Sequence, residues 1–260
     1  GQILDHYMLN VQFGQLRNNL TEVAPSGELV PELAESWEGS NGAKTWNFKV
    51  RQGVEFHNGK SLTSEDVVDS LNHHLGEDSK SAAKGQLGGV ASVRADGKYG
   101  VVVELTGGDA DFPFILTDYH ILICPSNGDG TIDWQSGGGT GGFSLVEHEP
   151  GVRTLTKANP NYWKPNRRFF DEVETLQIAD SAARENALRT GELDAMNNVS
   201  PKTADLLKRQ SGINVDSTKG NKQITLPMLT NVSPFDNNDV RTAMKYIVDR
   251  EQWLKVVARN

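Results

Sequence analysis

The sequence predicts an α/β fold in which helices cover a mixed sheet. Segments with helical apolar spacing and segments with alternating apolar residues follow one another along the chain. Several alternating segments are joined by tight turns, which adds antiparallel hairpins to the sheet. With 260 residues, of which 37% are hydrophobic, the chain can bury a substantial core. No repeat of about 20–50 residues occurs in the sequence, which excludes solenoids and propellers.

The first half of the chain contains helix and strand signals in alternation. Residues 3–19 carry apolar side chains at close to helical spacing, so a helix opens the chain. Thr63 can cap the free N–H groups of a second helix, whose acidic first residues suit the positive end of its dipole. Trp46, Phe48 and Val50 alternate, as in a half-buried strand. We expect helices at 3–19, from 63 onward and at 111–116, and strands at 45–50 and on either side of Asp96-Gly97 within 88–105.

The second half begins with a polar loop at 127–142 and continues as strands and helices. Pro150-Gly151 joins two strands, and Gly191 ends a helix in the usual position of a C-terminal glycine. The last helix carries a long apolar stripe, part of which we expect to lie exposed or to be covered by another copy of the chain. We expect strands at 143–147, 152–157, 172–178, 193–196, 213–217 and 223–229, and helices at 181–190, 201–210 and 239–259.

Charge and composition exclude several classes of protein. The net charge is −8 and the basic residues are scattered, so no nucleic-acid-binding surface is expected. No apolar run approaches the length of a membrane span. The single cysteine, Cys124, rules out a disulfide framework within the chain. Its apolar neighbours indicate a small buried side chain rather than a reactive thiol.

Seven short motifs follow one another over nearly the whole chain. They are residues 29–37 (LVPELAESW), 46–59 (WNFKVRQGVEFHNG), 62–68 (LTSEDVV), 139–143 (GTGGF), 159–163 (NPNYW), 187–194 (ALRTGELD) and 234–241 (PFDNNDVR). Each motif alone is weak evidence. Seven in this order closely resemble the extracellular solute-binding proteins, family 5, which are the peptide- and nickel-binding receptors of ABC importers.

The resemblance implies a periplasmic-binding-protein-like clamshell (type II, cluster C), of which this chain would hold mainly lobe I, with a mixed sheet and a β-rich subdomain. Residues 1–37 and 141–233 would form the ligand-facing α/β subdomain of lobe I, residues 38–140 the smaller β-rich subdomain, and residues 234–260 the start of lobe II. Family members begin with a leader and an extra strand, and continue past the position of Asn260. The chain is therefore expected to be a fragment that lacks the first strand and most of the second lobe.

The function implied by the resemblance is that of a substrate-binding subunit, not an enzyme. Such a protein binds a peptide or similar small solute between two lobes and delivers it to the membrane permease of an ABC transporter. It would be periplasmic or extracellular, and lipid-anchored outside the cell in a Gram-positive bacterium. A receptor for a nickel chelate, an opine or an oligosaccharide is an alternative, as is a secreted hydrolase or lyase that uses a pair of carboxylates.

Catalytic and metal-binding patterns are absent from the sequence. Six histidines occur without an HExxH motif, and no GxSxG elbow is present. His73 and His74 are adjacent, so on a helix they point about 100° apart, and we expect both to be exposed. We predict no catalytic residue, no metal site and no cofactor.

The glycine run at 137–142 has two interpretations. A phosphate-binding loop would need a lysine after it, and none follows. We favour a tight entry of the chain into Phe143, in which at least one of Gly141 and Gly142 takes a positive φ.

Three segments resemble ligand-lining positions of the peptide receptors, and a loop tryptophan is a further candidate. For the segment that ends at Tyr7 the alternative is a solvated helix face, and the two asparagines before Pro201 could instead cap a helix. Trp134 is either packed under its polar loop or presented to a ligand. Side-chain amides offer both a donor and an acceptor, which suits a peptide backbone. The predicted ligand residues are Asp5, His6, Tyr7, Tyr119, His120, Trp134, Asn197 and Asn198.

Overall fold

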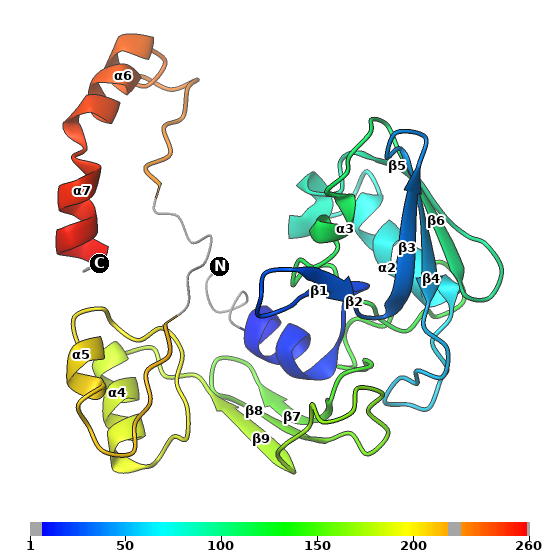
Figure 1. Ribbon diagram of the computed structural model, residues 1–260, viewed down its shortest axis with the longest axis horizontal. Coiled ribbons are helices and arrows are strands. Elements are labelled where there is room, and N and C mark those ends of the chain that lie inside the picture. Colours follow the sequence, from blue (N-terminus) through cyan, green and yellow to red (C-terminus); the bar gives the residue numbers. More distant parts are fainter. Residues whose placement is uncertain (1–6, 218–224, 259–260) are drawn as a thin grey trace. The chain divides into compact units, whose positions relative to one another are not determined.

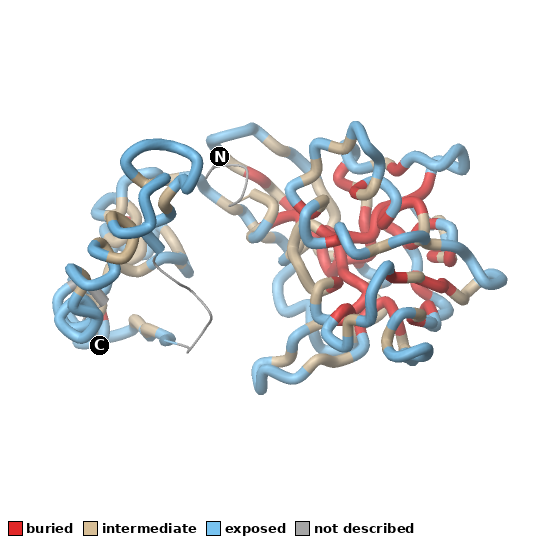
Figure 2. Tube along the Cα trace, turned by 90° about the horizontal axis from the view of Figure 1, so that it is seen from above, coloured by how far each residue is buried: buried red, intermediate tan, exposed pale blue. Residues whose placement is uncertain are grey.

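The computed structural model describes residues 7–217 and 225–258, and the chain divides into two compact units (Figure 1). The N-terminal unit ends at Gln177 and the C-terminal unit begins at Ile178. Figure 2 shows that buried residues concentrate in the N-terminal unit, and among the described residues of the C-terminal unit only Ala187 and Leu207 are buried. None of the described helices is both long and apolar enough to cross a bilayer. The subdomain boundaries expected at 37, 140 and 233 stay a prediction.

A four-stranded antiparallel sheet carries most of the core of the N-terminal unit. Along the second strand Trp46, Phe48 and Val50 are buried and Asn47 and Lys49 are exposed, which confirms the predicted strand. A helix packs Val67 and Leu71 into the same core. The two strands predicted around Asp96-Gly97 pair with each other, as expected. The sheet has the order β3-β4-β6-β5, with β3 (Ala34–Ser40), β4 (Thr45–Val50), β5 (Val90–Ala95) and β6 (Gly100–Leu105), and the helix is α2 (Ser64–Leu75).

The start of α2 is capped as the sequence predicts. The Thr63 N–H donates to Asp66 Oδ2 over 2.9 Å, and the Thr63 side chain accepts from the backbone of Asp66. Asp66 Oδ1 also accepts from Lys60 Nζ at 2.6 Å and from the Ser126 N–H at 2.8 Å. Cys124 lies just before Ser126 in the sequence. It is buried, as predicted, and burial raises the pKa of its thiol. Two short helices complete this part, η2 (Ala82–Gly85) and α3 (Phe112–Ile115).

The opening helix has a different register from the one expected. The described part, η1 (Met8–Leu16), is a π-helix, in which each N–H bonds to the carbonyl five residues earlier. Val11 and Leu16 are buried, so the predicted apolar face is present. Two short strands that the sequence did not predict follow, β1 (Thr21–Val23) and β2 (Leu29–Pro31), and they pair only with each other.

The three-stranded sheet β7-β8-β9 lies next to η1 in the N-terminal unit. Gln15 of η1 accepts from the Thr156 hydroxyl at 2.6 Å, and its amide donates to the Thr175 hydroxyl at 3.1 Å. These bonds join the helix to two strands far away in the sequence. All three strands were predicted, and their bounds are β7 (Phe143–Glu149), β8 (Arg153–Ala158) and β9 (Glu172–Leu176).

The C-terminal unit contains helices but, within its described residues, no strand. The helix α4 (Ser181–Thr190) has the predicted bounds. The Asp180 side chain accepts from the Ala183 N–H at its start, and Gly191 ends it with φ 78°. The predicted helix at 201–210 is reduced to α5 (Ala204–Leu207). The strands predicted at 193–196 and 213–217 are wrong, because alternation alone does not supply a partner strand. A strand was also predicted at 223–229. Residues 225–229 of this segment are not a strand, and the rest lies outside the described residues.

The last predicted helix is interrupted. It consists of α6 (Asn238–Ile247), α7 (Arg250–Trp253) and η3 (Leu254–Ala258), with extended backbone at Val248 and Asp249. The Asp249 carboxylate accepts from the Gln252 N–H at 2.9 Å, so this residue caps the start of α7 directly after the break. The expectation that part of the apolar stripe is exposed is confirmed, since Ile247 is 73% and Val256 66% exposed.

Candidate functional site

A line of hydrogen bonds runs along one side of η1 from Tyr7 to Arg17. Arg17 Nη1 donates to the Gln12 side-chain oxygen, and Gln12 Nε2 donates to the Tyr7 hydroxyl at 2.8 Å. The three residues are spaced five apart, and a π-helix places such residues on one side. In an α-helix they would point about 140° apart. The register of η1 therefore creates this line.

Arg17 also holds the loop that carries Trp134. Its Nη2 donates to the Trp134 carbonyl at 3.0 Å, and its Nε donates to the Gly138 carbonyl at 2.9 Å. The guanidinium is buried, and no carboxylate among the described residues lies within ion-pair distance of it. Tyr7 and Trp134, two predicted ligand residues, are thus joined through one buried cation. The Trp134 side chain is 53% exposed, so it is presented to solvent rather than packed under its loop.

A second buried network surrounds Lys164, directly after the motif 159–163. Lys164 Nζ lies 2.7 Å from both Glu32 Oε1 and Glu22 Oε2, and 5.2 Å from the centre of the Trp163 ring. Burial opposes the charged form of Lys164, but the two carboxylates outweigh it and raise its pKa. Asn18 donates to Glu32 Oε1 at 2.8 Å and so extends the network to the segment after η1. We call Glu22, Glu32 and Lys164 the Lys164 cluster.

The glycine run packs directly against the end of η1. A Cβ on Gly141 would lie 2.2 Å from the Gln15 carbonyl oxygen, and one on Gly139 would lie 2.0 Å from that of Leu16. The Gly141 N–H donates to the Leu16 carbonyl at 2.9 Å. The predicted positive φ at Gly141 or Gly142 is wrong, because neither residue has one. Close approach of two backbones, not a left-handed conformation, requires glycine here.

Two carbonyl oxygens of the glycine run form hydrogen bonds with other segments of the N-terminal unit. The Gly141 oxygen lies 3.0 Å from both His57 Nε2 and Asn159 Nδ2, and the Gly139 oxygen accepts from the His57 N–H at 2.9 Å. Burial lowers the pKa of His57, although the bond to the Gly141 carbonyl opposes this. These contacts fix the entry into β7, as expected, and leave the Gly141 N–H bonded to protein rather than open to a phosphate.

Tyr119 and His120 form a separate cluster after α3. Their rings are 3.9 Å apart, and His120 Nδ1 lies 2.8 Å from Asp118 Oδ1. The Asn19 side chain donates to the Asp118 carbonyl at 2.8 Å and so holds this turn on the segment that follows η1. A hollow of about 390 Å³ adjoins the cluster, and its walls are Gln86, Phe114, Ile115, Thr117 and Asp118.

His74 near this cluster is buried, which contradicts the expectation that both histidines of the pair are exposed. His73 is exposed, but His74 is 7% exposed and its Nδ1 lies 2.6 Å from the Ser81 hydroxyl. The next turn of chain, which begins at Ser81 and η2, covers the end of α2. Burial, together with the charges of His73 and His120, lowers the pKa of His74 from 6.5 to about 4.

We expect this histidine to make the protein sensitive to acid. Neutral His74 stabilises the fold fully above pH 6.5, and this contribution is lost as the pH falls toward 4. The loss amounts to on the order of 3 kcal/mol of unfolding free energy. Urea unfolding between pH 7 and 4 should show a shallower decline for His74→Gln than for the wild type. His73→Gln is the exposed control, and an equal slope in all three proteins would contradict the prediction.

The remaining predicted ligand residues cannot be placed with those above. Asp5 and His6 lie outside the described residues. Asn197 and Asn198 are exposed in the C-terminal unit, where Asn198 has φ 53°. Neither caps a helix, because α5 begins at Ala204 after Thr203. The capping alternative is therefore wrong, and their role in binding stays a prediction.

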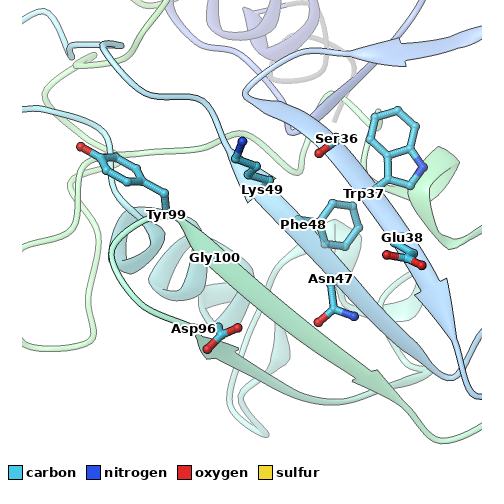
Figure 3. Close-up of a pocket in the computed structure, with 9 residues that line it drawn as sticks. All are labelled: Ser36, Trp37, Glu38, Asn47, Phe48, Lys49, Asp96, Tyr99 and Gly100. Carbon is cyan, nitrogen blue, oxygen red and sulfur yellow. The ribbon is translucent and has the colours of Figure 1, made fainter.

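An open hollow of about 660 Å³ lies on the solvent side of the four-stranded sheet (Figure 3). Its exposed side chains, such as Asn47 and Lys49, alternate with the buried ones along β4. None of the predicted ligand residues lines it. Among the residues that the structure describes, no three His, Cys, Asp or Glu side chains are grouped so that they could hold a metal ion.

Sequence reasoning did not single out Arg17, Gln12 or Lys164. The five-residue spacing of Tyr7, Gln12 and Arg17 is visible in the sequence, but it acquires meaning only once the helix is known to be π. Lys164 follows the motif 159–163 directly, and its position beside an expected buried tryptophan was the available signal.

Comparison with known proteins identifies related chains over most of this length. The model of the family "Bacterial extracellular solute-binding proteins, family 5 Middle" matches residues 28–260. Di/tripeptide-binding protein 1 of Pseudomonas aeruginosa is 25% identical over 266 residues, which is 92% of this chain and 50% of that protein. The chain thus spans about half the length of this relative.

Solved structures share the fold. The ABC transporter-associated periplasmic binding protein DppA from Helicobacter pylori, in complex with the peptide STSA, matches 96% of this chain and 53% of its own with a TM-score of 0.78 and 23% identity. NikZ from Campylobacter jejuni, in complex with Ni(L-His), matches 93% of this chain and 49% of its own with a TM-score of 0.79 and 20% identity. These matches confirm the predicted fold class, the α/β fold of type II periplasmic binding proteins.

Proposed function

We propose a function for this chain from one premise, which is that it belongs to the bacterial extracellular solute-binding proteins, family 5. We propose that the protein is the substrate-binding subunit of an ABC importer. It binds a peptide or similar small solute in a cleft between two lobes, outside the cytoplasm, and delivers the solute to a membrane permease. The match over residues 28–260 is the observation that carries this proposal.

A peptide is the solute class that we put first. Di/tripeptide-binding protein 1 is named for such ligands, and DppA was solved with a tetrapeptide. NikZ holds a nickel–histidine chelate on the same fold, so the fold alone does not select the ligand. The peptide proposal therefore needs a binding experiment on this protein.

The local chemistry suits a binding protein. Tyr7 offers a hydroxyl that is linked through Gln12 to the buried Arg17. Trp134 offers an exposed indole, and its carbonyl accepts from Arg17. Such prearranged groups lower the ordering cost of binding. We propose that Tyr7, Trp134, Tyr119 and His120 contact solute, together with Asp5, His6, Asn197 and Asn198.

A solute panel tests the proposal. We expect a rise in melting temperature with di- to pentapeptides and no effect of Ni²⁺–histidine, an opine or an oligosaccharide, and calorimetry should then give the affinity. Stabilisation by one of the other solutes and not by peptides would replace the peptide assignment. We also expect no hydrolysis of these peptides. Turnover that disappears on changing one polar residue would contradict a receptor role.

A further inference from the structure

The hydrogen bonds along η1 have a fixed direction. A guanidinium has N–H donors and no acceptor, so the Gln12 atom that faces Arg17 must be the amide oxygen. The Gln12 amide nitrogen then faces Tyr7 and can only donate, and it does so at 2.8 Å. The Tyr7 oxygen is thereby committed as an acceptor toward Gln12. Its own proton must point to another partner.

The ring of Tyr7 is held in place by a stacked neighbour. It stacks on His148 with the ring centres 4.2 Å apart, and His148 Nδ1 lies 2.8 Å from the Thr154 hydroxyl. Tyr7 is half-buried, whereas Gln12 and Arg17 are buried. Burial raises the pKa of Tyr7, so the phenol keeps its proton at neutral pH. No described residue accepts this proton.

We infer that Tyr7 is a fixed hydrogen-bond donor for a carbonyl or carboxylate oxygen of the solute, with Gln12 and Arg17 as the positioning residues that set its direction. The inference rests on the proposed function and adds to it the chemistry of one contact. Arg17 is buried and has no ion-pair partner among the described residues. Its charge polarises the Gln12 amide and, through it, the Tyr7 hydroxyl, because hydrogen bonds to charged groups are the stronger ones. An amine or other pure donor on the solute would leave the phenol proton of Tyr7 without an acceptor.

The substitution Gln12→Glu reverses the direction of the hydrogen bond between residue 12 and Tyr7, with little change in the shape of the side chain. A carboxylate at position 12 accepts from Arg17 and can only accept from Tyr7, so the phenol proton turns inward. The variant should fold, since it gives the buried Arg17 a counter-ion. Tyr7→Phe removes the hydroxyl and keeps the ring stacked on His148. Gln52→Glu, an exposed site in a turn before α2, is the control for the added charge.

Two measurements decide the inference. The first needs no solute. The ¹³Cζ signal of Tyr7, assigned among the five tyrosines by its loss in Tyr7→Phe, should shift downfield in Gln12→Glu and not in Gln52→Glu. The second is calorimetry with tri-alanine, for which we expect about tenfold weaker binding in Gln12→Glu and in Tyr7→Phe and unchanged binding in Gln52→Glu.

The outcomes separate this inference from the proposed function. An unshifted Tyr7 signal in Gln12→Glu overturns the donor assignment, whatever the protein binds. Wild-type affinity for tri-alanine in Tyr7→Phe, or in Gln12→Glu while Tyr7→Phe is weakened, also overturns it. If the wild type binds no solute of the panel, the proposed function fails, and the Tyr7 signal still decides whether the hydroxyl is a directed donor.

Discussion

Gly141→Ala should destabilise the N-terminal unit by about 3 kcal/mol. The added Cβ would lie 2.2 Å from the Gln15 carbonyl oxygen and 2.5 Å from the Leu16 carbonyl carbon. Both are backbone atoms in the last turn of η1, so neither can rotate away as a side chain could. The helix end and the glycine run must separate, and the hydrogen bond from the Gly141 N–H to the Leu16 carbonyl weakens with them. Urea unfolding at neutral pH measures the effect.

Two further glycines serve as controls for this prediction. A Cβ on Gly107 meets nothing within 4 Å and the residue has no positive φ, so Gly107→Ala should change stability little. A Cβ on Gly142 would lie 3.2 Å from the Tyr162 ring, which is a side chain that can shift, and we expect an intermediate loss. Equal stability of the Gly141 and Gly107 variants would show that the two backbones are not in close contact.

Lys164→Met should cost a similar amount, about 3 kcal/mol. Methionine keeps most of the length of the side chain but removes the charge that faces Glu32, whose side chain is 5% exposed. A buried carboxylate without its partner must either stay charged at low dielectric or take up a proton. The unfolding free energy of the variant should therefore rise as the pH is lowered through the range in which Glu32 becomes protonated.

An exposed ion pair and a double variant complete this test. Lys49 pairs with Glu35 on the sheet surface and is 60% exposed, so Lys49→Met should cost no more than about 1 kcal/mol. Adding Glu32→Gln to Lys164→Met removes the unpaired charge and should recover part of the loss. If the double variant is less stable than Lys164→Met alone, Glu32 is not the group that suffers from the missing lysine.

The sequence correctly predicted those helices and strands whose ends carry capping residues or tight-turn residues. The helix α4 has its predicted bounds because Asp180 caps its start and Gly191 adopts the left-handed conformation at its end. The strands on either side of Asp96-Gly97 and of Pro150-Gly151 were found because a tight turn brings neighbouring segments together. Burial along β4 follows the alternation of its residues. Each of these elements depends on residues close together in the sequence.

Elements that depend on distant partners were missed or wrongly assigned. The strand β3 has little apolar alternation and exists because it pairs with β4. The segments 193–196 and 213–217 were predicted as strands but are not part of any sheet. Pairing across a sheet is a property of two segments, so a pattern within one of them cannot establish it.

The sequence by itself determined the family, the α/β class, the marked hairpins and helices, and the buried faces, because periodicity and turn chemistry act over a few residues. Only the tertiary structure decided the π register of η1, the close contact of Gly141 with that helix, and the two buried networks. Arg17 reaches carbonyls 117 and 121 residues away, and Lys164 reaches carboxylates 132 and 142 residues away. Such contacts depend on how distant segments pack, and the side-chain directions that form the candidate site follow from that packing.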